Sequence, residues 1–295
     1  MLDSHPMVAV PDEAPWLVRV ARDRAGLERD GRLQTDAFVH RLWQDRTFRR
    51  WHLTEDAVRS ALAANSSATF SDGVRLVYGL YASSKGKTRY ADKTPWAVMH
   101  ISLLAGLFPE AVFVHVIRDG RDVALSYLDA GFGPPSLEMG ALEWRRYVGE
   151  GRRAGLALGP ERYREVRYEE LAASPDATVR DLCPFLGLDF DESMLRYFER
   201  ADEVVGSMPH PHARRNVFLP PTSGLRDWRT TLTDRQAEVF TALAGPLLHE
   251  LRYEAGPQPS PRARVAAAGA RARWWLHRLR QRAQRARRTA QSSKE

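Results

Sequence analysis

The sequence predicts an α/β protein whose core is a parallel sheet flanked by helices. Three short segments that favour strands, at 88–92, 112–117 and 164–168, each lie ahead of a helix signal. Strands that alternate with helices are joined by right-handed crossovers, which place the strands parallel to one another. The chain has 295 residues, of which 43% are hydrophobic, so it can bury a sizeable core. Functional residues are expected at the carboxyl ends of these strands, where such sheets bind ligands.

The first strand, TRYAD at 88–92, is followed by Thr94 as a helix N-cap and by Pro95 at the first helical position. The helix that begins there is expected to run to about Phe108. The second strand, VFVHVI at 112–117, is nearly unbroken in apolar character. That pattern is typical of a strand buried on both faces of a parallel sheet.

The third strand, REVRY at 164–168, lies ahead of a helix that begins at Ser174 and Pro175. This helix is expected to reach about Leu186, where Gly187 stops it. The sequence thus predicts three strand-to-helix connections.

The C-terminal third is predicted to be mostly helical. Thr233 and Gln236 form a capping-box pattern that begins a helix to about Leu251. The proline-rich segment at 209–224 is a long loop, and loops of this length are usually functional or mobile. We therefore divide the chain into an α/β domain at 1–255, a linker at 256–262 and a basic tail at 263–295, either helical or disordered.

The positive charge belongs to the tail. From Gln258 onward the sequence has ten arginines and one lysine against one acid, a net charge of +10. Taken from the total of +7, this leaves residues 1–257 with a net charge of −3. Cys183 is the only cysteine, so no intramolecular disulfide can form, and a reducing, cytoplasmic setting is predicted. The sequence has neither a signal-peptide pattern at its start nor an apolar run of about 18 residues.

The tail also has an apolar stripe at helical spacing, flanked by arginines. A basic amphipathic helix of this kind, within 263–290, can lie on an anionic membrane or bind a polyanion, without specificity for a nucleic acid. The alternative is a solvated, partly disordered extension. The stripe consists of Val265, Ala268, Ala272, Trp275, Leu276, Leu279, Ala283 and Ala286.

The segment VHVIRDGRDVALSY at 114–127 predicts a phosphate-binding turn between a strand and a helix. Asp119 can cap the new helix, and Gly120 leaves its backbone unobstructed. Free amides and the dipole at a helix start attract anions. Arg118 can donate paired hydrogen bonds to a phosphate, and Ser126 offers a hydroxyl on the same helix face as Asp119. The alternative is a structural ion pair between an arginine and an aspartate.

The block ADKTPWAVMHISLLAGLFPEAVFVHVIRDGRDVALSY at 91–127 resembles the sulfotransferases that use 3′-phosphoadenosine 5′-phosphosulfate (PAPS). It is most similar to the bacterial and tyrosylprotein members, and the resemblance extends over 1–253. It implies a sheet like that of the P-loop NTPases and a donor 3′-phosphate held by Arg118 and Ser126. YEELAASP at 168–175 resembles the family's strand-borne Tyr-Glu pair, which implies that Tyr168 contacts the nucleotide.

The same resemblance implies a catalytic pair. The chain begins MLDSHPMVAVPDE, and Glu13 falls on the family's base, with Asp12 as a weaker candidate. Lys93 of DKTP matches the lysine that faces the transferring group. Sulfuryl transfer needs a base for the acceptor proton and cations for the charge on the moving group. The alternative is a solvated loop carboxylate and a surface lysine.

This chain differs from the family's sequence pattern in two places. In the family, the first strand and the loop that binds the 5′-phosphosulfate come directly before M-L-D-x-H-P, and we expect this chain to lack both. Either the start is assigned too late or the chain is a truncated or degenerate homologue. As it stands, the chain is expected to bind 3′,5′-adenosine bisphosphate weakly and to transfer little sulfate. The late loop that closes the 3′-phosphate site resembles 223–233 only loosely, and Arg226 is the first candidate contact there, with Arg214 and Arg215 as alternatives.

The predicted activity is therefore transfer of a sulfuryl group from PAPS to a hydroxyl of a small molecule, carbohydrate or peptide, without a metal. His210 and His212 lie on a proline-rich loop without partners that would make a metal site. The alternatives are an inactive nucleotide-binding homologue, or a polyanion or membrane-surface binder that acts through the basic tail.

Overall fold

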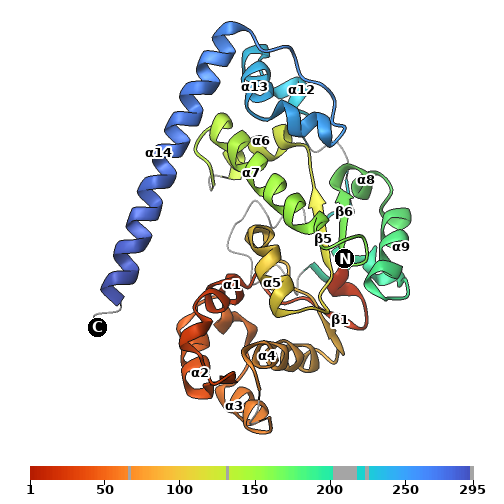
Figure 1. Ribbon diagram of the computed structural model, residues 1–295. Helices are drawn as coiled ribbons and strands as arrows, with labels where there is room; N and C mark the ends of the chain where they lie inside the picture. Colours follow the sequence, from red (N-terminus) through yellow and green to blue (C-terminus); the bar gives the residue numbers. More distant parts are fainter. Residues whose placement is uncertain (66–67, 131–132, 202–217, 223–225, 293–295) are drawn as a thin grey trace. The chain divides into compact units, whose positions relative to one another are not determined.

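The computed structural model describes residues 1–65, 68–130, 133–201, 218–222 and 226–292. It divides into two units, each treated by itself: unit 1 is Met1–Val116 with Glu150–Ser223, and unit 2 is Ile117–Gly149 with Gly224–Glu295. Helices alternate with strands along the chain, and the strands include parallel pairs beside one antiparallel hairpin, which confirms the α/β class (Figure 1).

Unit 1 begins with four helices around an apolar core. Trp16 of the first helix lies 5.4 Å from the ring of Trp51, and Trp51 lies 4.8 Å from Tyr78. The fourth helix begins at a capping box in which Thr69 and Asp72 exchange hydrogen bonds. The α-helices of unit 1 are α1 (Pro15–Arg22), α2 (Thr35–Gln44), α3 (Glu55–Ala63), α4 (Phe70–Ser84), α5 (Ile101–Leu107), α8 (Tyr168–Ala173) and α9 (Pro175–Leu186). Its short 3-10 helices are η1 (Leu2–Ser4), η2 (Arg24–Gly26), η3 (Phe48–Trp51), η4 (Pro95–His100), η5 (Glu192–Met194) and η6 (Tyr197–Arg200).

Within the described residues the strands form three pairs. β1 (Val8–Ala9) and β4 (Arg89–Tyr90) are parallel, with Ala9 opposite Tyr90. β2 (Glu28–Arg29) and β3 (Arg32–Leu33) form a hairpin whose turn residues, Asp30 and Gly31, both have positive φ, as a two-residue hairpin turn requires.

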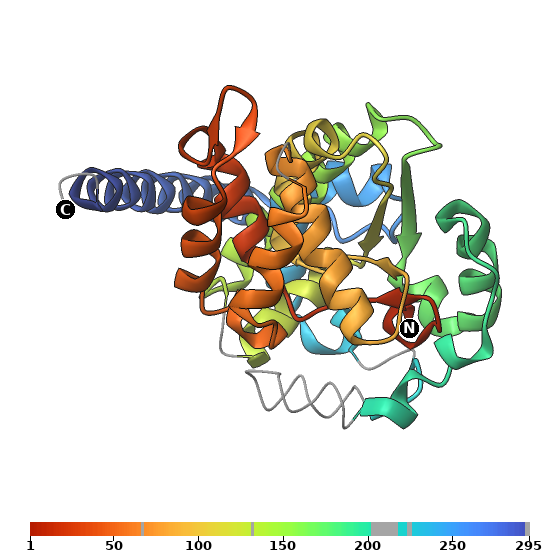
Figure 2. The same ribbon diagram turned by 90° about the horizontal axis from the view of Figure 1, so that it is seen from below.

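The third pair is β5 (Phe113–Ile117) with β6 (Tyr163–Arg167). The N–H of Phe113 donates to the carbonyl of Arg162, so both strands start side by side and run parallel (Figure 2). The prediction that 112–117 is buried on both faces is wrong: Val112 is 36% exposed and Val116 is 50% exposed. In the described part of the chain β5 pairs with β6 alone, so its apolar side chains are only partly covered.

The predicted helices after the strands are present. Pro95 begins η4, which continues as α5 and ends before Phe108. α9 ends at Gly187, which adopts the left-handed conformation of a helix C-terminus. The third strand ends one residue earlier than predicted, because Tyr168 begins the unpredicted helix α8.

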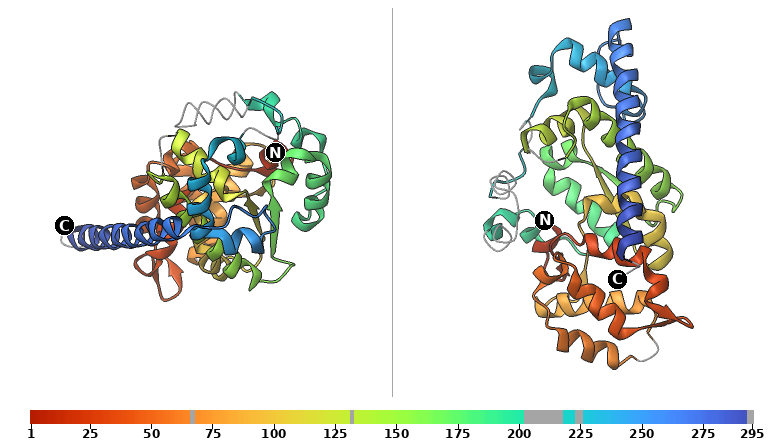
Figure 3. Two further views of the ribbon diagram at one scale, coloured as in Figure 1. Left: turned by 90° about the horizontal axis from the view of Figure 1, so that it is seen from above. Right: turned by 90° about the vertical axis from the view of Figure 1, so that its left-hand side faces the viewer.

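Unit 2 packs four helices around its own core: α6 (Gly120–Ala130), α13 (Asp234–Glu250), α14 (Pro261–Ser292) and the first part of α7 (Leu137–Leu156), which crosses into unit 1. The short helix α12 (Trp228–Thr231) precedes α13, which begins at the predicted capping box. The predicted tail is one long helix, α14 (Figure 3). Its Ala263, Ala267 and Ala270 are buried in the core of unit 2. Among the described residues no helix is long and apolar enough to cross a membrane.

Candidate functional site

The turn from β5 into α6 has the predicted cap. The Asp119 carboxylate accepts the backbone N–H of Arg121 at 2.9 Å, which satisfies a donor in the first turn of the helix. Gly120 has a further reason to be glycine. A Cβ there would come within 2.3 Å of the Trp144 ring, whose indole N–H donates to the carbonyl of Arg118 at 3.0 Å. The close approach of α7 therefore fixes the geometry of this turn.

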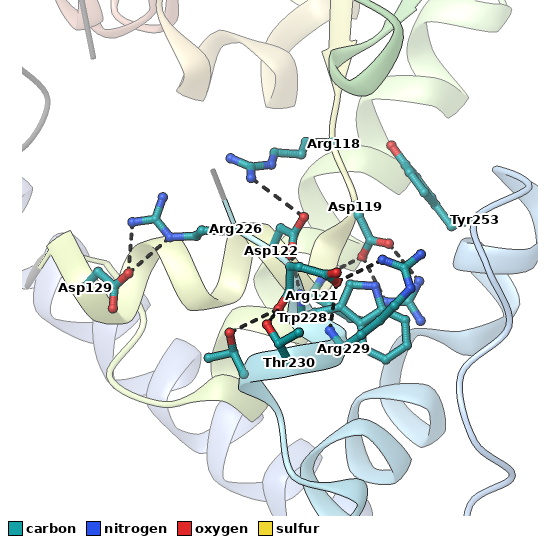
Figure 4. A network of polar contacts seen from close by, with 12 residues as sticks. Arg118, Asp119, Arg121, Asp122, Asp129, Arg226, Trp228, Arg229, Thr230 and Tyr253 are labelled. Atoms are coloured by element: carbon teal, nitrogen blue, oxygen red, sulfur yellow. Dashed lines mark hydrogen bonds and ion pairs between the residues drawn. The ribbon is translucent and has the colours of Figure 1, made fainter. Parts of the chain in front are cut away.

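Arg118 and Asp122 form an ion pair across the first turn of α6, with 3.7 Å between Nη2 and Oδ2 (Figure 4). Their side chains are 19% and 12% exposed. The Asp122 carboxylate also accepts the backbone N–H of Trp228 at 3.0 Å. Burial raises the pKa of Asp122, and the Arg118 charge acts in the opposite direction.

A second arginine, Arg226, lies outside α6 but is bound by a carboxylate of that helix. Its Nε and Nη2 donate to the Asp129 carboxylate at 3.1 and 2.9 Å. Asp122, Ser126 and Asp129 have the spacing i, i+4, i+7, so they lie along one face of α6. This face therefore presents a half-buried serine hydroxyl between two arginine–carboxylate pairs.

Arg121 has a structural role that was not predicted from the sequence. Its side chain is fully buried and donates to Asp119 through Nε and Nη2, at 3.0 and 2.7 Å. It also donates to the carbonyl of Glu254 and stacks on the Trp228 ring at 3.7 Å. Arg121 thus forms the structural arginine–aspartate pair of this turn, with Asp119, and it holds the segments around Trp228 and Glu254 against α6.

In unit 1 the structure brings Glu13 and Lys93 together. Lys93 Nζ donates to Glu13 Oε1 at 2.6 Å, and the two side chains are 66% and 51% exposed. The juxtaposition follows from the parallel pair β1 and β4. Because the strands run in the same direction, the segments after Ala9 and Tyr90 leave from the same end of the pair.

Buried hydrogen bonds hold these two segments. The Thr94 hydroxyl accepts the backbone N–H of Ala14 at 2.8 Å, next to Glu13. The Tyr78 hydroxyl donates to Asp92 at 2.7 Å, next to Lys93. Burial raises the pKa of the Asp92 carboxyl, while hydrogen bonds from Tyr78 and Thr94 oppose that shift. Thr94 was predicted as a helix cap, but its side chain makes no capping hydrogen bond to η4.

Tyr168 is half-buried at the first position of α8, directly after β6. The predicted contacts thus fall in both units: Glu13, Lys93 and Tyr168 belong to unit 1, and Arg118, Ser126 and Arg226 belong to unit 2. The alternatives Arg214 and Arg215, and the histidines His210 and His212, lie outside the described residues. Among the residues that the structure does describe, no cluster of His, Cys, Asp and Glu could hold a metal ion.

The chain is similar in sequence to a protein family and to several known proteins. A family model described as "Sulfotransferase family" matches residues 1–192. Protein-tyrosine sulfotransferase 1 of Danio rerio is 23% identical over 268 residues, covering 88% of this chain and 69% of that protein. Protein-tyrosine sulfotransferase A of Caenorhabditis elegans is 22% identical over 270 residues, covering 88% and 64%. Nodulation protein NoeE of Sinorhizobium fredii is 25% identical over 291 residues, covering 91% and 65%. The chain thus spans about two thirds of the length of these relatives.

Two solved structures are also similar. The sulfotransferase domain from the curacin biosynthetic pathway has a TM-score of 0.48 at 16% identity, covering 86% of this chain and 92% of the other. The sulfotransferase domain from the Synechococcus PCC 7002 olefin synthase has a TM-score of 0.43 at 24% identity, covering 66% and 69%.

Proposed function

The chain belongs to the sulfotransferase family, and from this premise we propose that it transfers a sulfuryl group from PAPS to a hydroxyl acceptor. The observation that carries the proposal is the face of α6 on which Ser126 lies between the Arg118–Asp122 and Arg226–Asp129 pairs. Arginine matches the geometry of a phosphate, and a serine hydroxyl adds a donor. These three side chains are proposed to hold the 3′-phosphate of the donor.

Glu13 and Lys93 are proposed to carry the chemistry. The acceptor oxygen forms a bond to sulfur while the bond between sulfur and the 5′-phosphate oxygen breaks. Glu13 takes the acceptor proton, Lys93 stabilises the charge on the moving group, and 3′,5′-adenosine bisphosphate leaves. Their ion pair supports this assignment, because it places a base beside a cation at an exposed position. An exposed pair is worth less than about 1 kcal/mol, so a sulfonate can compete for Lys93.

The remaining contacts follow the same proposal. Tyr168, at the start of α8, is proposed to contact the nucleotide. The acceptor is a hydroxyl of a peptide, carbohydrate or small molecule, and the names of the relatives make a peptide tyrosine the first to test. A cytoplasmic location is proposed from the single cysteine, Cys183, which is buried.

A turnover assay tests this function. The full chain is incubated with PAPS and a panel of tyrosine peptides, sugars and phenols, and formation of 3′,5′-adenosine bisphosphate is measured. Turnover by Glu13→Gln is expected to fall about 10²- to 10⁴-fold, the usual contribution of a general base. The exposed carboxylate variant Glu161→Gln is the matched control and should retain turnover. Equal turnover by Glu13→Gln and the parent chain would remove Glu13 from its role.

A further inference from the structure

The helix α14 has a second apolar face, which the core of unit 2 does not use. Its inner face consists of Ala263, Ala267 and Ala270, all buried, with Trp274 partly buried against the same core. These residues recur every three or four positions, as one face of a helix does. The outer face has the same spacing and consists of Val265, Ala268, Ala272, Trp275, Leu276 and Leu279, all exposed.

The two faces point in opposite directions. At about 100° per residue, the middle of the outer stripe lies roughly opposite the buried alanines. Trp275 is 59% exposed and Leu276 is 50% exposed, which is unusual for large apolar side chains that neighbour each other on one helix. The inner face therefore packs the helix against the core of unit 2, and the side chains of the outer face are exposed to solvent.

Arginines flank the outer stripe on both sides. Arg273 and Arg280 fall on one flank, and Arg264 and Arg271 fall on the other, and all four are exposed. From Pro261 to Ser292 the sequence has ten arginines and no acidic residue. Long arginine side chains beside an apolar stripe can extend toward phosphate groups while the stripe enters an apolar layer.

We propose that the outer face of α14 docks the protein on an anionic phospholipid surface. A polyanion such as a nucleic acid would match the arginines but would leave the apolar stripe without a partner. A second copy of α14 would cover the stripe, but it would bring two arginine-rich helices together with no acidic residue on either to neutralise them. An anionic bilayer supplies both an apolar layer and negative charge. A tryptophan on the stripe suits the interfacial region of a bilayer.

Substitutions test this proposal better than deletion of the helix, because deletion would expose the core that Ala263, Ala267 and Ala270 cover. The full chain is sedimented with vesicles of phosphatidylcholine alone and with vesicles containing about 30% phosphatidylserine. One variant, Trp275→Ser/Leu276→Ser, removes apolar area, and another, Arg273→Gln/Arg280→Gln, removes charge. Their matched controls are Leu156→Ser, at a position 57% exposed, and Arg49→Gln/Arg50→Gln, at exposed positions of η3.

The parent chain is expected to sediment with the anionic vesicles and not with phosphatidylcholine alone. Each α14 variant should weaken this partition about tenfold or more, and the controls should not. Circular dichroism confirms that the variants keep their helix content. The proposal is overturned if the parent chain stays in solution. It is also overturned if the apolar variant binds as well as the parent, which would indicate a polyanion site, or if light scattering shows a dimer that the apolar variant abolishes.

Discussion

At the scale of single residues, the backbone beside Glu13 depends on a hydrogen bond between Ala14 and a threonine 80 positions further along the sequence. The Thr94 hydroxyl accepts the buried N–H of Ala14 and so fixes the backbone beside Glu13, while Lys93 adjoins Thr94 in the chain. A buried backbone donor needs a partner, because leaving it unsatisfied costs about 1–3 kcal/mol. The DKTP segment thus supplies both the cation of the pair and the bond that positions its carboxylate.

We expect Thr94→Val to lower the free energy of unfolding by about 1–3 kcal/mol, because valine keeps the shape but not the acceptor. Sulfuryl transfer should fall as well, since the loop that holds Glu13 loses its tie. Thr94→Ser keeps the hydroxyl and should restore both properties. The exposed variant Thr88→Val is the control. Denaturant unfolding and PAPS turnover check this prediction, and parent-like values of both for Thr94→Val would contradict it.

The roles of some residues of the candidate site could be predicted from the sequence, and the roles of others could not. Arg118 and Ser126 stand in a local motif whose spacing suggested a phosphate site, and Glu13 and Lys93 could be proposed because their segments resemble those of a known family. Arg121 could not, because its position between Asp119 and the carbonyl of Glu254 depends on a contact 133 residues away in the chain. The acceptor role of Thr94 was missed for the same reason, and a threonine before a proline has a simpler local explanation as a helix cap.

At the scale of elements, the start of α6 depends on how closely α7 packs against it. Gly120 allows the Trp144 ring to lie over the turn, and the indole N–H then holds the carbonyl of Arg118. The motif suggested that Gly120 keeps the backbone accessible to an anion. The structure adds a packing reason, which concerns the same turn but depends on a residue 24 positions later.

Two glycine substitutions separate this packing role from helix propensity. Gly120→Ala should lower the free energy of unfolding by about 1–3 kcal/mol, because its Cβ would overlap the Trp144 ring. Gly149→Ala, inside α7 with open space around the new Cβ, should raise the same free energy by about 0.5–1 kcal/mol. Thermal or urea unfolding of the two variants checks this. Equal effects of the same sign would show that propensity alone decides both positions.

Helices whose ends are marked by capping residues could be predicted from the sequence. Features that depend on contacts between residues far apart in the chain could not. The helices that end at Gly187 and begin at Thr233 have local caps, and both are present. The burial of β5 was overestimated because an apolar run reports composition and not the number of neighbouring strands. α8 was missed because Tyr168, a residue type that favours strands, follows β6 directly, and no capping side chain marks the start of the helix.

At the scale of the whole molecule, charge divides unevenly along the chain. Residues 1–257 have a net charge of −3, and the segment that contains α14 has +10. The sequence predicted a basic tail that is either helical or disordered, and in the structure α14 shares a core with α13 and α7 through its buried alanines. Alanines spaced by three and four residues gave a weak signal, because the larger Val265, Trp275 and Leu276 defined a different stripe in the sequence.

One face of α6 is proposed to bind the phosphate of a nucleotide, and calorimetry with 3′,5′-adenosine bisphosphate tests this binding most directly. We expect the full chain to bind weakly but measurably, and Arg118→Ala to weaken binding about 10- to 100-fold further, as loss of a charge-assisted hydrogen-bonding group does. The exposed variant Arg49→Ala is the matched control and should bind like the parent chain. If the parent chain fails to bind, or if Arg118→Ala binds as tightly as the parent, the claim is contradicted.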